Sequence, residues 1–157
     1  ACGPAGMVSG QSLDLSELAS PDITEATLAE IHDLKTGQLM LACINMVLAA
    51  GDPSPDVSSA LRNFATHLGL AFQMQDDYLD AYGPTEGLGK NRASDRENNK
   101  STFANCYTEK ALQQIIQIHF EKTEAALVLF GSRAEPLRCL LNKLLKRSSA
   151  LFTPQKQ

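Results

Sequence analysis

Apolar residues recur every three or four positions along most of the chain, which is the spacing of one face of an α-helix. Between residues 22 and 50 the first such positions are Leu28, Ile31 and Leu34. The stretch 39–46 that follows is apolar on nearly all sides, which is typical of a buried helix. The alternation of a strand is not sustained anywhere. The pattern therefore predicts an all-α protein, a bundle of long helices.

Capping residues, glycines and prolines divide this pattern into separate helices. Asp22 with Glu25 resembles a capping box at the start of the first long helix, and Ser54 followed by Pro55 starts the second. The glycine-containing segment 83–99 predicts a long loop, and such loops are often functional. The chain order we expect is the end of a helix and then a loop over 1–20, helices over 22–50, 54–81, 101–107, 108–130 and 136–149, and a frayed tail over 153–157.

The composition is that of a globular protein able to bury a core, with 43% hydrophobic and 20% charged residues among 157. This length suits one domain, 1–157, or part of one. The formal net charge of −4 argues against a broad nucleic-acid interface. The longest apolar stretch, 39–50, has 12 residues and contains Asn45, whereas a membrane span needs about 20. We therefore expect neither a membrane span nor a secretory signal, and predict a cytoplasmic protein.

The four cysteines lie far apart and form no C-x-x-C pair, so neither a zinc knuckle nor a redox dithiol is expected. They are most simply core residues in a reducing compartment. His32, His67 and His119 have no second histidine at metal-ligand spacing, which indicates structural or exposed roles.

An acidic cluster follows the apolar part of the second long helix. Asp76 and Asp80 are four residues apart and share a helix face with Gln73, and Asp77 lies beside them. Two carboxylates about 6 Å apart repel by about 3 kcal/mol at an effective dielectric constant near 20. No lysine or arginine lies between residues 63 and 89 to offset this repulsion. The cluster is therefore either solvated or binds a cation, and hard oxygen ligands of this kind suit Mg²⁺.

Basic residues follow the acidic cluster within the predicted loop. Lys90, Arg92, Arg96 and Lys100 fall within 11 residues and could bind a diphosphate. Lys35 lies just before the apolar part of its helix, so its ammonium group must either reach solvent or meet an anion. Taken singly, the acidic helix end, the basic loop and Lys35 are each more often solvated surface than binding site.

These residues belong to four short motifs that occur in a fixed order. The motifs are Gln11-Ser12-Leu13-Asp14-Leu15, Lys35-Thr36-Gly37, Phe72-Gln73 with Asp76-Asp77-Tyr78-Leu79-Asp80, and Gly89-Lys90 with Asp95 and Lys100-Ser101-Thr102. The set resembles the C-terminal half of trans-isoprenyl diphosphate synthases, the farnesyl and geranyl diphosphate synthase family. The resemblance spans about residues 1–105.

The resemblance implies the C-terminal half of an isoprenoid-synthase fold, a helical bundle around a large cavity, usually in a homodimer. It also implies a Mg²⁺-dependent prenyltransferase that condenses an allylic diphosphate with isopentenyl diphosphate. A divalent ion would stabilise charge on the departing diphosphate, and an apolar cavity would shield the carbocation from water.

The same resemblance implies roles for individual residues. Asp76 would bind Mg²⁺ directly, and Asp77 and Asp80 would support it. Lys35 and Lys90 would bind the allylic diphosphate, with Lys100 and Asp95 at its edge. Thr36 and Gln73 would line the site near the allylic centre, and Phe72 would contact the tail of the second substrate.

The sequence also departs from the family pattern. Its only Asp-Asp pair is Asp76-Asp77, so the first D-D-x-x-D motif is missing, and the family chain is about twice as long. Asn99 and Ala104 stand where many bacterial members have Gly and Pro. We therefore expect a fragment that is inactive alone. The alternatives are a non-catalytic homologous subunit and a helical interaction module whose acidic cluster is only solvated surface.

Overall fold

The computed structural model describes residues 1–17, 23–83 and 102–152, and the described residues contain helices and no strand. The predicted all-α class is confirmed. In chain order the elements are α1 (Met7–Glu17), α2 (Glu25–His32), the π-helical η1 (Asp33–Gly37), α3 (Gln38–Gly51), α4 (Pro55–Tyr82), α6 (Phe103–Cys106), α7 (Glu109–Ala126), the 3₁₀-helical η2 (Val128–Ala134) and α8 (Glu135–Phe152).

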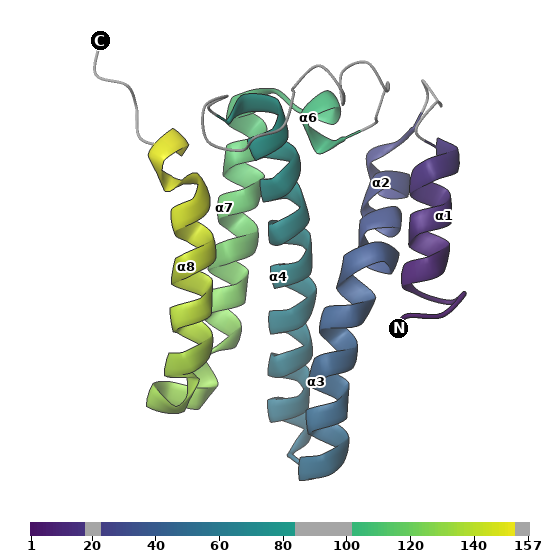
Figure 1. Ribbon diagram of the computed structural model, residues 1–157. Coiled ribbons are helices and arrows are strands. Elements are labelled where there is room, and N and C mark those ends of the chain that lie inside the picture. The colour runs from purple at the N-terminus through teal and green to yellow at the C-terminus, as the bar shows by residue number, and fades with distance from the viewer. Residues whose placement is uncertain (18–22, 84–101, 153–157) are drawn as a thin grey trace.

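The long helix α4 runs through the middle of the structure (Figure 1). Helices α7 and α8 lie on one side of it, and the continuous stretch from α2 to α3 lies on the other, with α1 outside α2. The short α6 lies near one end of α4, where it contacts α2 and α7 as well.

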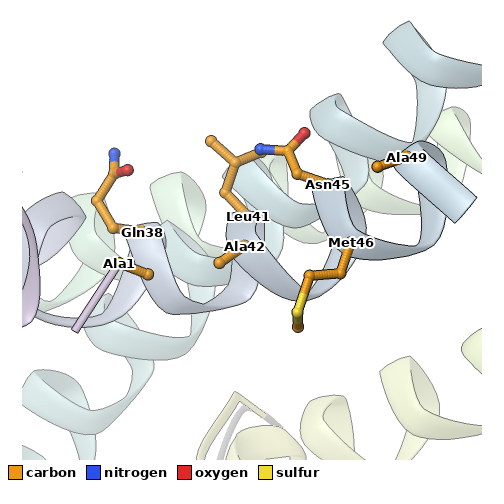
Figure 2. A pocket seen from close by; sticks show the side chains of 7 residues that line it. All are labelled: Ala1, Gln38, Leu41, Ala42, Asn45, Met46 and Ala49. Atoms are coloured by element: carbon orange, nitrogen blue, oxygen red, sulfur yellow. The ribbon is translucent and has the colours of Figure 1, made fainter.

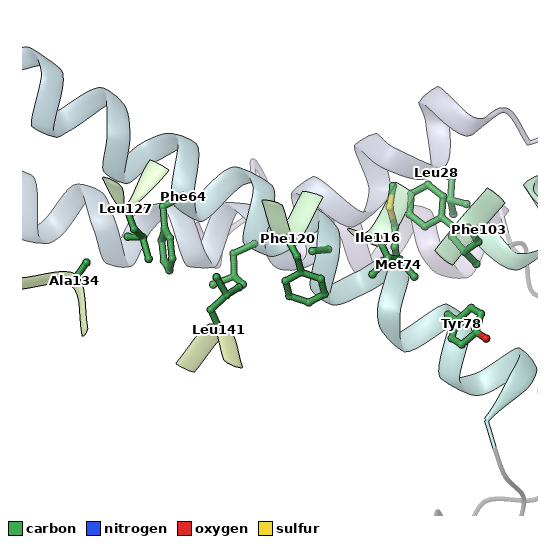
Figure 3. Close-up of a cluster of buried hydrophobic side chains, with 13 residues drawn as sticks. Leu28, Phe64, Met74, Tyr78, Phe103, Ile116, Phe120, Leu127, Ala134 and Leu141 are labelled. Atoms are coloured by element: carbon green, nitrogen blue, oxygen red, sulfur yellow. The ribbon is translucent and has the colours of Figure 1, made fainter. Parts of the chain in front are cut away.

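Most of the buried core lies between α4, α7 and α8 (Figure 3). Its largest members include Phe64, Met74, Ile116 and Phe120, each at most 5% exposed. Burying a side chain of this size contributes about 1.5–3 kcal/mol. This packing fixes the position of α4 and, with it, of the acidic residues near the end of that helix.

Several predicted boundaries are confirmed and others need correction. Ser54 caps α4, accepting a hydrogen bond from the Val57 amide at 3.4 Å. The helix predicted from Asp22 instead begins at Glu25, because Thr24 caps it by accepting from the Thr27 amide at 3.1 Å; Asp22 lies outside the described residues. Residues 1–20 were expected to hold the end of a helix and then a loop, and the structure places the helix α1 over 7–17.

The helix predicted over 108–130, which corresponds to α7, ends earlier than expected. It stops at Ala126 instead of near Phe130, and the chain continues as the 3₁₀-helix η2. Gly131 lies within η2 with a φ of 55°, a backbone conformation that glycine adopts without strain. The apolar spacing continued past Ala126, which is why periodicity alone placed the end too late.

Helix α3 is far more exposed than its composition predicted. Leu48 is its only buried residue, whereas Met46 and Val47 are 67% and 63% exposed. Only one side of α3 packs, against α4 and η1, so a helix that is apolar all round leaves its other side uncovered. The expectation of a fully buried helix was therefore wrong for this chain.

The stretch Glu25–Gly51 is also long and apolar enough to be scored as a candidate membrane span, with a mean hydropathy of 1.3 over an 18-residue window. Length and composition alone are weak evidence for a span, although only 11% of this window is buried, so burial does not mark it as a core helix. The polar contacts of Lys35 and Thr36 to neighbouring helices, described below, are typical of a packed helix instead.

The cysteines do not occupy the core. All four are free thiols and all four are exposed: Cys2, Cys43, Cys106 and Cys139. The expectation that they are core residues was therefore wrong, and the apolar core is built from leucine, isoleucine, methionine and aromatic side chains instead.

Two histidines meet across the α4–α7 interface. The Nδ1 atoms of His67 and His119 lie 3.3 Å apart. Burial, and to a smaller extent Lys122, lowers the pKa of His67, and burial together with His67 and Lys122 lowers the pKa of His119 to about 4. The folded state therefore holds this pair neutral at pH values at which a free histidine is already protonated.

We predict that this pair makes the fold sensitive to mild acid. Because the folded-state pKa lies below the usual value of 6.5, the unfolded state binds more protons between about pH 6.5 and 4. Stability conferred by the neutral pair is full above pH 6.5 and decreases as the pH falls. Each proton linked in this way changes the free energy of unfolding by about 1.4 kcal/mol per pH unit.

Urea denaturation of wild type and His119→Gln at pH 7.5, 6.0 and 5.0 tests this prediction. The variant should lose less stability on acidification, because its amide does not titrate. Equal loss in both proteins would contradict the prediction.

Candidate functional site

The first two sequence motifs are brought together by a close contact between α1 and η1. A Cβ atom added at Gly10 would lie 2.8 Å from the Cα of Lys35, closer than such atoms approach in folded proteins. Only a glycine at this position lets α1 lie directly on the Lys35 backbone.

The same contact pairs Lys35 with an anion. Its Nζ donates to Oδ2 of Asp14 at 2.7 Å, and the side chains are 25% and 8% exposed respectively. The sequence predicted that Lys35 would either snorkel or meet an anion, and in the structure it meets Asp14, in the motif Gln11-Ser12-Leu13-Asp14-Leu15. Asp14 was not among the predicted site residues, although its motif was recognised.

A second close contact joins η1 to α4. A Cβ atom at Gly69 would lie 3.3 Å from the Cα of Gly37, so the two backbones nearly touch. Just beyond this crossing, Thr36 Oγ1 donates to Gln73 Oε1 at 3.0 Å. The Lys35-Thr36-Gly37 motif therefore lies beside the start of the acidic motif. η1 is a π-helical turn, and such turns are frequent at functional sites.

Asp76 is paired with a cation from a distant part of the chain. Arg147 Nη2 in α8 donates to Asp76 Oδ1 at 2.6 Å, and the side chains of Arg147 and Asp76 are 39% and 32% exposed. The guanidinium carbon also lies 5.1 Å from the centre of the Phe72 ring, within the range of a cation–π contact. The sequence left the cluster either solvated or bound to a cation such as Mg²⁺, and Arg147 was not foreseen as a partner because 71 residues separate it from Asp76.

Asp77 has a different environment from Asp76. It is buried, and its Oδ2 accepts a hydrogen bond from the backbone amide of Phe103 at 2.9 Å. The same oxygen lies 3.5 Å from Nε2 of His32, whose ring stacks on that of Phe103 at 5.1 Å. Asp77 thus holds the first residue of α6 against α4 and α2. Its predicted role as a magnesium ligand stays a prediction.

The other face of the motif is occupied by helix contacts. Gln75 Nε2 donates to the carbonyl oxygen of Leu144 in α8 at 2.8 Å. Tyr78 donates to Glu109 at 2.9 Å and accepts from Gln113 at 2.6 Å, both in α7. Burial raises the pKa of the Tyr78 phenol, which keeps it protonated. These contacts orient α4 so that Gln73 and Asp76 face away from the α7 interface.

Asp80 is exposed, one turn after Asp76 on α4. Among the described residues no group of three or more histidine, cysteine, aspartate and glutamate side chains is placed to hold a metal ion. Mg²⁺ commonly uses one or two carboxylates and completes its coordination with water and phosphate oxygens. The exposed carboxylate of Asp80 and the cation-paired carboxylate of Asp76 therefore fit Mg²⁺ as a partial ligand set.

The predicted residues Lys90, Asp95 and Lys100 lie outside the described residues, so their roles stay predictions. The residues on either side of this segment are placed: Gly83 follows α4 directly, and the backbone amide of Phe103 donates to Asp77.

An open pocket of about 400 Å³ lies elsewhere, along α3 (Figure 2). Its lining is mostly apolar and consists of Ala1, Gln38, Leu41, Ala42, Asn45, Met46 and Ala49. None of the predicted site residues lines it. The pocket is therefore a feature of the uncovered side of α3 and is separate from the polar contacts at Lys35, Gln73 and Asp76.

Comparison with known proteins agrees with these motifs. Residues 4–128 match the sequence profile of the family described as "Polyprenyl synthetase". The chain belongs to the polyprenyl synthetase family. A farnesyl diphosphate synthase of Geobacillus stearothermophilus is 35% identical over 127 residues, which cover 81% of this chain and 42% of that relative.

Solved structures of polyprenyl synthetases show the same fold. A geranyltransferase from Legionella pneumophila superposes with a TM-score of 0.80 at 48% identity, over 93% of this chain and 46% of the other. A Helicobacter pylori geranyltransferase complexed with magnesium and isoprenyl diphosphate gives a TM-score of 0.65 at 27% identity, over 94% of this chain and 47% of the other. The chain thus spans about half the length of these relatives.

We predict that Gly10→Ala disrupts the α1–η1 contact. The new methyl group must displace the Lys35 backbone, and overpacking of this kind costs about 1–3 kcal/mol. The free energy of unfolding from urea denaturation should fall by that amount. Gly51→Ala is the matched control, since a Cβ there meets nothing within 4 Å and its stability should be unchanged or slightly higher. Equal stabilities of Gly10→Ala and wild type would contradict the prediction.

We predict that Asp77 contributes more to stability than Asp80 does. Asp77→Ala leaves the Phe103 amide without its acceptor, at a cost of about 1–3 kcal/mol. Hydrogen exchange at the Phe103 amide should accelerate accordingly. Asp80→Ala, at an exposed position, should cost less than about 1 kcal/mol. If Asp77→Ala were no more destabilising than Asp80→Ala, the anchoring role of Asp77 would be ruled out.

Proposed function

We propose that this chain supplies the diphosphate- and magnesium-binding half of a prenyltransferase site that condenses an allylic diphosphate with isopentenyl diphosphate. The observation that carries the proposal is the hydrogen bond from Thr36 to Gln73, because it joins the Lys35-Thr36-Gly37 motif to the acidic helix. The family membership and the names of the relatives support the same chemistry.

The polar residues of this site suit an anionic substrate. Lys35 has three N–H donors, and its pairing with Asp14 fixes the position of the ammonium group beside η1. Charge-assisted hydrogen bonds from such a group to phosphate oxygens are about twice as strong as neutral ones. We assign the allylic diphosphate to Lys35, with Lys90 and Lys100 as further predicted contacts.

Thr36, Gln73 and Phe72 would position the reacting carbon chain. The hydrogen bond between Thr36 and Gln73 holds both side chains in one orientation. Phe72, which is only partly buried, lies one turn before Asp76 and offers an apolar surface next to the acidic residues. When bound, Mg²⁺ would stabilise negative charge on the diphosphate oxygens as the allylic carbon–oxygen bond breaks.

Asp76 and Asp80 are the residues to which we assign Mg²⁺, with Asp77 and Asp95 as further predicted ligands. The neighbour crystallised with magnesium and isoprenyl diphosphate supports the metal as a cofactor of this family. In the present chain Asp76 already accepts a hydrogen bond from a cationic group, which shows that its surroundings tolerate a positive charge.

The full activity is proposed for the enzyme of which this chain corresponds to about half. The chain contains a single Asp-Asp pair, and we propose that it does not condense the two substrates by itself. We also propose a cytoplasmic homodimer. Exposed apolar residues on α1 and α3, such as Val8, Leu15 and Met46, support association with another chain.

The proposal predicts that the chain binds inorganic pyrophosphate in a Mg²⁺-dependent manner. Asp76→Ala should weaken this binding about tenfold or more, because a metal-binding carboxylate is lost, and Lys35→Ala should do the same by removing a charged donor. Isothermal titration calorimetry with and without Mg²⁺ measures the effect.

Asp56→Ala is a suitable control, since Asp56 is an exposed residue in the first turn of the same helix α4, far from Asp76 along the helix. It should bind as wild type does. Pyrophosphate binding that is equal in wild type and Asp76→Ala would leave the acidic residues as solvated surface and refute the proposal.

A further inference from the structure

The cation on Asp76 comes from α8, on the opposite side of α4 from the Lys35-Thr36-Gly37 motif (Figure 1). Arg147 lies against two residues of α4, Phe72 and Asp76, which are one turn apart. Its guanidinium therefore covers the part of α4 to which the proposed function assigns the metal and the substrate chain.

The ion pair between Arg147 and Asp76 can be replaced by another cation on Asp76. Both side chains of the ion pair are partly exposed, and ion pairs of this kind contribute little net stability because water and salt compete with them. The 5.1 Å contact with Phe72 adds to the attraction without burying the guanidinium. A divalent ion held by the same carboxylate would repel Arg147, since both are cations.

We propose that Arg147 is an internal competitor of the metal: it occupies Asp76 until a divalent cation binds, and metal binding then releases the turn of α8 that carries Arg147. This inference rests on the proposed function. Because coupling between two equilibria is reciprocal, removal of Arg147 raises the affinity of Asp76 for the metal, and the metal weakens the contact between α8 and α4 at Arg147.

The release is confined to one end of α8. Three residues before Arg147, the carbonyl oxygen of Leu144 accepts the hydrogen bond from buried Gln75, and Leu141 is buried in the core. These contacts do not involve Asp76, so they hold α8 on α4 whether or not Arg147 is paired. The exchange therefore changes the local environment of Arg147 and leaves the packing of the bundle intact.

The test is a calorimetric titration of Mg²⁺ into the 157-residue chain in the presence of inorganic pyrophosphate. Arg147→Ala should bind Mg²⁺ about threefold to tenfold more tightly than wild type. Lys143→Ala removes one positive charge from an exposed position one turn earlier on α8 and should change the affinity less than about twofold. Arg147→Gln serves as a second variant if Arg147→Ala folds poorly by circular dichroism.

Hydrogen exchange supplies a readout that does not depend on affinity. Addition of Mg²⁺ and pyrophosphate to wild type should accelerate exchange of amides near Arg147, and exchange near Leu141 should stay unchanged. In Arg147→Ala the same amides should already exchange rapidly, and the ligands should have no further effect on them.

The outcomes separate this inference from the proposed function. Unchanged or weaker Mg²⁺ affinity in both Arg147 variants would overturn the competition, while binding by wild type that depends on Asp76 would still support the proposed function. Binding by Arg147→Ala but not by wild type would support the competition strongly. Absence of binding in every variant would overturn both.

Discussion

The arrangement of the site depends on the close packing of the π-helical turn Asp33–Gly37 between α1 and α4. On one side the turn meets Gly10, and on the other Gly37 meets Gly69. Larger side chains at these contacts would push the helices apart and separate Lys35 from Asp14 and Thr36 from Gln73. The glycines therefore act through backbone distance, and the polar contacts that follow are a consequence of it.

The three aspartates of one motif show how burial determines what a carboxylate can do. Asp77 faces inward, accepts a hydrogen bond from the Phe103 amide and lies 3.5 Å from Nε2 of His32, so it anchors α6. Asp76 is half exposed and is met by Arg147, and Asp80 is exposed. Electrostatic repulsion among three neighbouring carboxylates is thus reduced by giving each a different environment, and Asp76 and Asp80 are the two that face outward.

The sequence was sufficient for the fold class, for the start and end of α4 and for the order of the motifs, because these depend on helical periodicity and local capping. It was not sufficient for the π-helical turn, since Asp33–Gly37 keeps an uninterrupted helical pattern. Arg147 could not be assigned to Asp76 either, because the contact depends on how α8 packs on α4. The prediction that α3 is buried was wrong for a related reason, because apolar composition does not indicate on which sides a helix has neighbouring elements.

The buried core is distributed unevenly around the site. Helices α4, α7 and α8 share the large buried side chains, so the position of the acidic motif is fixed from that side. The α1–η1 side is held mainly by glycine contacts and the Asp14–Lys35 pair, and α3 contributes a single buried residue. Arg147 belongs to the well-packed side but pairs beyond the last core contact of its helix. The guanidinium of Arg147 can therefore leave Asp76 without disturbing the core. A residue that faces a metal-binding carboxylate requires this freedom.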